Sequence, residues 1–225
     1  MSQAPLPQPQ HQPQDQLPGP PGRPAETSWR PRIVHDQDPV DLVAAERAAT
    51  DLLRALGLPL QQEALADTPR RMATALAEML TVPAFDFTTF PNTEDYDELV
   101  LVEDIPVRSV CEHHVLPFVG VAHIGYLPGD RILGLSKLAR VVDFFAHRPQ
   151  TQERLTKQIA DQLQRQLAPR GVGVVVEAEH TCMTLRGVRA VGARTATSAL
   201  HGTLRDDPAA RAEFLSLTHP RKESR

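Results

Sequence analysis

The chain of 225 residues contains two cysteines, and each lies close to a histidine. Cys111 opens the segment CEHH, which also holds His113 and His114, and Cys182 ends the segment HTC, two residues after His180. Thiolate and imidazole are ligands that Zn²⁺ prefers, and three such ligands leave a fourth position open for water, as in catalytic zinc sites. The pattern therefore indicates a catalytic zinc centre built from two separate segments.

The spacing leaves two questions about this centre open. Cys111 and His113 share a face if the backbone stays extended, whereas Cys111 and His114 converge only if the chain turns. In the strand expected over 171–182, alternate residues share a face, so His180 and Cys182 should point the same way. The alternative is that both cysteines are small buried apolar residues and that the histidines are hydrogen-bonded core groups.

A basic segment, GLSKLAR, lies between the two halves of this centre. Ser136 precedes an expected helix, and Lys137 and Arg140 lie three positions apart on one face of its first turns. A helix N-terminus with basic side chains attracts phosphate through its unpaired N–H groups and through charge. Arg186, four residues after Cys182, would add a positive charge to the same cleft. The alternative is a basic face exposed to solvent.

Gln152 and Glu153 stand at the head of the next expected helix. A carboxylate in this place commonly serves only to interact favourably with the helix dipole. A carboxylate that faces a cleft can also accept two hydrogen bonds from an N–H/NH₂ edge such as that of guanine. The two interpretations differ in whether Glu153 faces a ligand.

Composition excludes several classes of protein. A formal net charge of -4 argues against a general nucleic-acid binder, which carries a basic stripe. No apolar stretch approaches the length needed to span a bilayer, so we expect no membrane partner. Two cysteines are too few for a disulfide framework, and the N-terminal residues lack the features of a signal peptide. We therefore expect a cytoplasmic, reduced protein.

The residue pattern divides the chain into three segments. Residues 1–38 are rich in Pro and Gln and predict a disordered tail, with a ligand for a proline-binding module as the alternative. Residues 39–220 are periodic and predict one domain, and 221–225 form a short C-terminal tail. Helices are expected over 38–57, 67–80, 136–147, 151–167 and 206–217, and strands over 98–110, 115–128, 171–182 and 193–202. Strands in antiparallel order with grouped helices indicate an α+β fold.

Four segments, in this order and spacing, closely resemble the GTP cyclohydrolase I family. They are SVCEHHVLPFVGVAHIGYLP, GLSKLAR, RPQTQERLTKQIA and HTCMTLRGV. The resemblance implies roles for residues of each segment. Those roles are Zn²⁺ ligands at Cys111, His114 and Cys182; catalytic histidines at His113 and His180; a serine near the ribose at Ser136; guanine recognition by Gln152 and Glu153; and triphosphate binding by Lys137, Arg140 and Arg186.

The resemblance also implies a fold, an assembly and a reaction. The fold is the tunnelling fold, an antiparallel sheet with helices on one face, assembled into a toroidal homodecamer with active sites at subunit interfaces. The reaction converts GTP and water to 7,8-dihydroneopterin triphosphate and formate, the first step of tetrahydrofolate or biopterin synthesis. His180 is expected to protonate a ring nitrogen, with His113 as a helper. Two rivals are a tunnelling-fold nitrile reductase, which would need no zinc, and a non-enzymatic zinc-stabilised binding module, which would need a fourth protein ligand.

Overall fold

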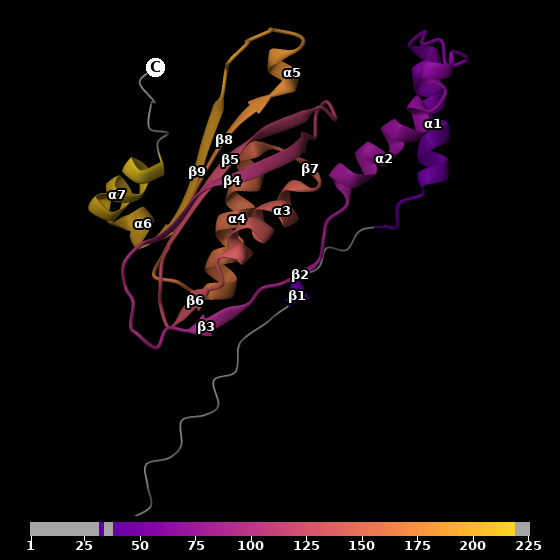
Figure 1. Cartoon of the computed structure of the whole chain (residues 1–225). Coiled ribbons are helices and arrows are strands. Elements are labelled where there is room, and N and C mark those ends of the chain that lie inside the picture. The colour runs from indigo at the N-terminus through magenta and orange to yellow at the C-terminus, as the bar shows by residue number, and fades with distance from the viewer. Residues whose placement is uncertain (1–31, 34–37, 219–225) are drawn as a thin grey trace, which may run out of the picture.

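A computed structural model describes residues 32–33 and 38–218 of the chain. Its centre is a five-stranded sheet with the strand order β7-β4-β5-β8-β9 (Figure 1). The four long strands are antiparallel, and the short β7 pairs with β4 in parallel. The strands span Val100–Cys111 (β4), Pro117–Leu127 (β5), Pro149–Gln150 (β7), Gly171–His180 (β8) and Thr195–Gly202 (β9).

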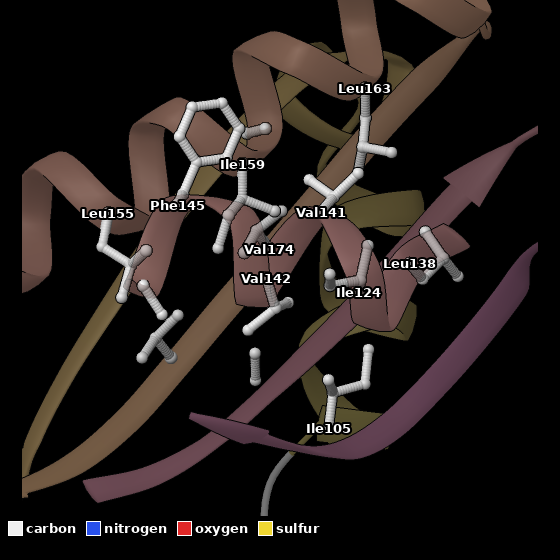
Figure 2. Packing of buried hydrophobic residues seen from close by; sticks show 14 of the residues in the cluster. Ile105, Ile124, Leu138, Val141, Val142, Phe145, Leu155, Ile159, Leu163 and Val174 are labelled. Atoms are coloured by element: carbon white, nitrogen blue, oxygen red, sulfur yellow. The ribbon is translucent and has the colours of Figure 1, made fainter. Parts of the chain in front are cut away.

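Two helices, α3 (Ser136–Ala146) and α4 (Gln152–Leu167), cover one face of this sheet. Their apolar stripes meet the even-numbered residues of β5 and β8, such as Ile124 and Val174, because alternate residues of a strand share a face. Figure 2 shows these side chains interlocking between helices and sheet. The core contains Leu138, Val141, Val142, Leu155, Ile159 and Leu163, each no more than 1% exposed. These residues recur at three- and four-residue intervals, so they form one apolar stripe on each helix.

The opposite face of the sheet carries a smaller layer at one end. There α6 (Thr203–Asp206) and α7 (Pro208–Thr218) bring Phe214 against the sheet, beside Val175. Gly173 makes room for this ring, since a Cβ atom on it would lie 2.6 Å from Phe214. The expectation of helices on one face is therefore incomplete: the main helical layer lies on one face and the C-terminal helices on the other.

The first two helices form a hairpin apart from the sheet layers (Figure 1). They span Leu42–Ala55 (α1) and Thr68–Leu80 (α2), joined through the short helix η1 (Glu63–Leu65). The helix expected from residue 38 begins later, because the Asp41 side chain caps it by accepting from the Ala44 N–H at 2.9 Å. The second helix begins close to where Pro69 predicts it, with this proline in the first turn.

Short strands that the sequence analysis did not predict complete the fold. They are β1 (Arg32–Ile33) pairing with β2 (Phe85–Asp86), and β3 (Thr89–Pro91) pairing with β6 (Arg131–Leu133). Two residues of the expected tail thus form a strand, while 1–31, 34–37 and 219–225 lie outside the described residues. Among the helices that are described, none is both long and apolar enough to cross a membrane.

The antiparallel α+β pattern is confirmed, but the strand expected over 171–182 is too long. Strand β8 ends at His180, and Cys182 lies in the one-turn helix α5 (Thr181–Thr184). The last rung of the ladder pairs His180 with Phe118, and the partner strand begins one residue earlier at Pro117. Proline has no N–H to donate to a further rung, and the Thr181 hydroxyl instead donates to the Pro117 carbonyl at 2.6 Å.

Candidate active site

A hollow of about 240 Å³ lies where β4 and β8 end and α4 begins. Its walls come from three short segments, 111–114, 150–153 and 180–183, together with Thr195. The first segment is the corner after β4, the second leads into α4, and the third leads from β8 into α5. The fold thus brings the two cysteine segments and the Gln-Glu segment into one site.

The CEHH corner turns sharply at the end of β4. The Cys111 carbonyl accepts from the His114 N–H at 3.3 Å and from the Val115 N–H at 2.9 Å, and Val115 takes a positive φ of 53°. The Cys111 N–H donates to the Leu116 carbonyl at 2.8 Å and closes the turn. Cys111 Sγ therefore lies 3.7 Å from His114 Nδ1, and also 3.9 Å from His113 Nδ1.

Three ligand atoms converge across the hollow. The thiols of Cys111 and Cys182 and a ring nitrogen of His114 all lie within 4.8 Å of one another. This donor set of two thiols and one imidazole suits Zn²⁺. Cys111 is buried, Cys182 is partly buried and His114 is exposed, so the cluster has a protein side and an open side. An open side fits a site that admits a water or a substrate.

Electrostatics around the thiols favours a cation. Burial raises the pKa of the Cys182 thiol, and the charge of Cys111 and its hydrogen bond raise it further, whereas Arg186 acts in the opposite direction. Metal binding deprotonates a coordinating thiol, so a bound divalent cation would relieve the repulsion between the two sulfurs. The residues present therefore fit a zinc ion.

His180 is held from two sides at the end of β8. Its ring stacks on Phe118, with 4.5 Å between the ring centroids and 10° between the planes. Its Nε2 lies 2.8 Å from Gln152 Oε1. Burial lowers the pKa of His180, and the negative charge of Glu153 partly opposes this effect. The resting imidazole is therefore biased toward its neutral form.

The adjacent Gln152 and Glu153 point to different surroundings, although both line the hollow. Gln152 is 1% exposed, whereas Glu153 is exposed and able to contact a ligand. The Thr151 hydroxyl caps α4 by accepting from the Arg154 N–H at 3.3 Å. The sequence predicts that both residues lie at the head of a helix, and the structure confirms that placement.

Arg154 connects the helix to the CEHH corner. Its guanidinium donates to the Glu112 carboxylate, to Gln150 Oε1 at 2.8 Å and to the Pro149 carbonyl at 2.8 Å. The sequence pattern does not point to Arg154, because its partner Glu112 lies 42 positions away and no helical or strand periodicity relates the two. Phe118 and Thr195 are likewise not indicated by the sequence, because each contacts a site residue that is distant along the chain.

Four expected site residues do not line the hollow: Ser136, Lys137, Arg140 and Arg186. The first three lie in the opening turns of α3, shortly after β6, and Figure 1 shows β6 far from α5 and β7. Arg186 is exposed just beyond α5 and reaches the site only through its charge on Cys182. A single chain therefore assembles the candidate metal ligands, His113, His180, Gln152 and Glu153, but not the expected triphosphate residues.

Fold and site together have the form of an enzyme: an antiparallel sheet whose strand ends place a metal-type cluster, histidines and a carboxylate around one hollow. The family model described as GTP cyclohydrolase I matches residues 45–219. Because this match covers most of the chain, the chain belongs to the GTP cyclohydrolase I family of hydrolases.

Individual relatives agree with the family assignment. The chain is similar to GTP cyclohydrolase 1 of Mycobacteroides abscessus, with 55% identity over 182 residues, covering 79% of this chain and 89% of the relative. The corresponding protein of Mycobacterium leprae is 53% identical over 198 residues, covering 85% and 94%. That of Mycolicibacterium vanbaalenii is 54% identical over 182 residues, covering 79% and 90%.

Proposed function

We propose that this enzyme converts GTP and water to 7,8-dihydroneopterin triphosphate and formate. The observation that carries the proposal is the convergence of two thiols, an imidazole, His180 and Glu153 on one hollow in a chain of this family. Water adds at C8 of the guanine imidazole ring and the ring opens to a formamide, from which a second water releases C8 as formate; the later ring closure releases one water, so one is consumed overall. The ribose then rearranges by an Amadori-type step and closes on the freed amine.

Cys111, His114 and Cys182 would hold Zn²⁺ in this enzyme. When bound in such a site, the metal lowers the pKa of a coordinated water toward ~7. Full deprotonation of both thiols and a neutral His114 are required for binding, so affinity should fall at acidic pH. No fourth protein ligand joins the cluster among the residues that the structure describes, which supports a catalytic site over a closed structural one.

Proton transfer is assigned to His180 and His113. His180, positioned between Phe118 and Gln152, is proposed to deliver a proton to a ring nitrogen as the imidazole of GTP opens. The more exposed His113 is proposed to assist in proton transfer or substrate placement. A positioned acid of this kind typically contributes about 10² to 10⁴ in rate.

Base recognition is assigned to the head of α4. The exposed carboxylate of Glu153 is proposed to accept hydrogen bonds from the N1–H and the exocyclic amine of guanine, with Gln152 beside it. These two donors are absent as a pair from adenine. A carboxylate that accepts both therefore selects guanine, because a wrong base leaves polar groups unpaired.

The triphosphate and ribose residues are proposed to come from a neighbouring subunit of a toroidal homodecamer. Ser136 would serve the ribose stage, and Lys137, Arg140 and Arg186 would bind the triphosphate. Two observations support a shared site: none of these residues lines the hollow of its own chain, and apolar side chains near Arg186 are exposed. Leu185, Val188 and Val191 are 76%, 77% and 86% exposed, as expected of an interface.

The product would enter tetrahydrofolate or biopterin synthesis, and the enzyme is proposed to act in the cytoplasm. Both cysteines are free, and a reducing compartment keeps thiols available as metal ligands. Reduced thiols are what the proposed zinc site requires.

The test is to incubate the purified protein with GTP and to follow formate together with the fluorescence of the oxidised pterin, with and without a zinc chelator. The proposal predicts that both products appear together and that both are lost on chelation. Formate without pterin would contradict the ribose steps. Neither product, from protein shown to contain zinc, would contradict the reaction as a whole.

A further inference from the structure

We propose that Gln152 keeps a proton on Nε2 of His180 and so holds the neutral ring in a single tautomer. Nδ1 is then the ring nitrogen that is available to the substrate. The inference rests on the proposed function in one respect, the role of His180 in proton transfer. A neutral ring with Nε2–H takes up a proton at Nδ1 from the attacking water, and the same Nδ1–H then delivers it to the ring nitrogen of GTP. It assigns Gln152 a role as a positioning residue in addition to, and separable from, any contact with the base.

The orientation of the Gln152 amide is fixed by two backbone carbonyls. Its Nε2 lies 2.9 Å from the Val176 carbonyl oxygen and 2.9 Å from the Thr195 carbonyl oxygen. A carbonyl oxygen only accepts hydrogen bonds, so the amide NH₂ group must face both. The flipped amide would place Oε1 against two acceptors in a site that is 1% exposed, where no water would relieve the mismatch.

A chain of hydroxyl groups agrees with this orientation. The Thr156 hydroxyl donates its only proton to the backbone carbonyl of Gln152 at 2.8 Å. The Thr197 hydroxyl, 2.6 Å from Thr156 Oγ1, must then be the donor of that pair. Its lone pairs remain for Gln152 Nε2 at 3.1 Å. All of these hydrogen bonds can form together only if Nε2, and not Oε1, of Gln152 faces the Thr197 hydroxyl.

The tautomer of His180 follows from the amide. Gln152 Oε1 lies 2.8 Å from His180 Nε2, and an amide oxygen can only accept. His180 Nε2 must therefore carry a proton, and in the neutral ring Nδ1 carries the lone pair. Within the described part of the chain, Nδ1 has no hydrogen-bond partner, and the stacking on Phe118 fixes the plane in which it points.

This arrangement suits a residue that must present one defined nitrogen to a substrate. A neutral amide orients the imidazole without adding a second negative charge beside Glu153. A histidine in the wrong tautomer loses most of its catalytic power even where the geometry is intact. Gln152 therefore acts through His180, and the exposed Glu153 remains the direct contact with the base.

The kinetic test replaces Gln152 by methionine, which keeps the length of the side chain but removes Oε1. For the zinc-loaded enzyme with GTP, we expect kcat to fall by about 10- to 100-fold while KM stays within about two-fold, since the loss concerns proton transfer rather than binding. Thr197→Val is the matched control, because it removes a partner of Gln152 Nε2 and keeps the Oε1 contact. It should retain near wild-type kcat. A rise in KM with kcat unchanged in Gln152→Met would overturn the inference.

A spectroscopic readout tests the tautomer without turnover. Solid-state ¹⁵N NMR of the zinc-loaded wild-type protein, labelled at histidine, distinguishes Nε2–H from Nδ1–H, and His180→Asn identifies the signal by its disappearance. We expect Nε2–H for His180 in the wild type. Observation of Nδ1–H there would overturn the inference even if Gln152→Met failed to fold.

The two proposals fail in different ways. A wild-type protein that releases neither formate nor pterin contradicts the proposed function, and the NMR tautomer then decides the Gln152–His180 contact alone. A fully active wild type whose Gln152→Met variant keeps kcat contradicts only the positioning role.

Discussion

The turn after Cys111 shows how backbone hydrogen bonds at single residues bring together side chains that spacing alone does not single out. In the sequence, the Cys-x-His and Cys-x-x-His pairs of CEHH are equally plausible pairs of metal ligands. The Cys111 carbonyl accepts from the N–H groups of both His114 and Val115, which folds the chain back and carries His114 into the cluster with Cys182. His113 is also exposed and lies close to Glu112.

The first prediction concerns the two thiols. Replacing Cys111 or Cys182 with serine should remove stoichiometric zinc and reduce turnover to background, because the site has only three protein ligands in the described chain. Metal content by mass spectrometry and formate release would measure both effects. Met183→Leu, a change in the adjacent residue of α5, is the control and should keep both; retained zinc in either serine variant would refute the assignment.

The second prediction concerns base recognition. Glu153→Gln should raise KM for GTP by about 10-fold or more, since the neutral amide accepts less strongly and presents a donor to the donor edge of guanine. Steady-state kinetics over a range of GTP concentrations would measure it. Glu63→Gln, an exposed carboxylate of η1, is the control. An unchanged dependence of rate on GTP concentration would remove Glu153 from the base site.

At the scale of elements, the head of α4 organises the site. Three consecutive residues there point in different directions: Gln152 contacts β8 and β9, Glu153 lines the hollow, and Arg154 contacts the corner after β4. Helix geometry separates neighbouring side chains by about 100°, so one turn serves three directions. The sequence predicted the helix and its first residues, but their partners come from strands distant in sequence.

The third prediction concerns the link between α4 and the CEHH corner. Arg154→Ala should weaken zinc binding by about 10- to 100-fold, because the groups that support metal ligands commonly have effects of this size. Competition with a chromophoric chelator would measure the affinity. Arg165→Ala, in the last turn of the same helix, removes only a bond to Gln162 and should leave the affinity unchanged. Equal affinities for all three proteins would contradict the link.

The fourth prediction concerns the polar contact between α4 and β9. Burial raises the pKa of Asp161, but hydrogen bonds and charge from Lys157 and His201 lower it more, so the net pKa lies below the ordinary 3.8. A carboxylate with a depressed pKa stabilises the fold above its ordinary pKa, and the contribution is lost as pH falls through the folded value.

Asp161→Asn should therefore cost about 1 kcal/mol or less of unfolding free energy at pH 7, given partial exposure and screening. The difference from wild type should shrink as the pH falls below about 4. Denaturant unfolding at several pH values would measure it. Asp51→Asn, in an exposed pair with Arg54 at 3.8 Å, is the control. A difference that grows toward low pH would contradict the sign.

At the scale of the whole molecule, one chain does not gather around the hollow all the residues that the proposed function assigns to the site. The hollow gathers the candidate metal ligands and the carboxylate of Glu153, which is proposed to read the base, whereas Lys137 and Arg140 lie in the first turns of α3, elsewhere in the fold. Apolar side chains of α1 and of its C-cap also remain exposed: Leu42 (46%), Val43 (67%) and Leu52 (48%) in the helix, and Leu56 (67%) at the cap. Both features agree with the proposal that neighbouring subunits complete the surface and the site.

The fifth prediction tests this sharing of sites. Cys182→Ser and Lys137→Ala should each be inactive alone, yet mixed oligomers of the two should regain activity, because some sites would combine an intact cluster with an intact lysine. Random 1:1 mixing should restore about a quarter of wild-type turnover if two subunits contribute to each site. Activity after co-expression and light-scattering mass would measure it. No recovery in verified mixed oligomers would place Lys137 and Cys182 in the same subunit's site.

The sequence by itself determined the helices and strands of the main layers, the apolar stripes and the residue types of the site, because periodicity and motif spacing are local properties of the chain. The end of β8 before Cys182 depended on the register with Pro117, and the position of His114 beside Cys111 and Cys182 depended on the turn at Cys111. Only the tertiary structure decided which way the Gln152 amide points and where Arg154 reaches, since their partners lie 24 to 45 residues away. Such contacts exist only after packing has brought distant strands beside the helix.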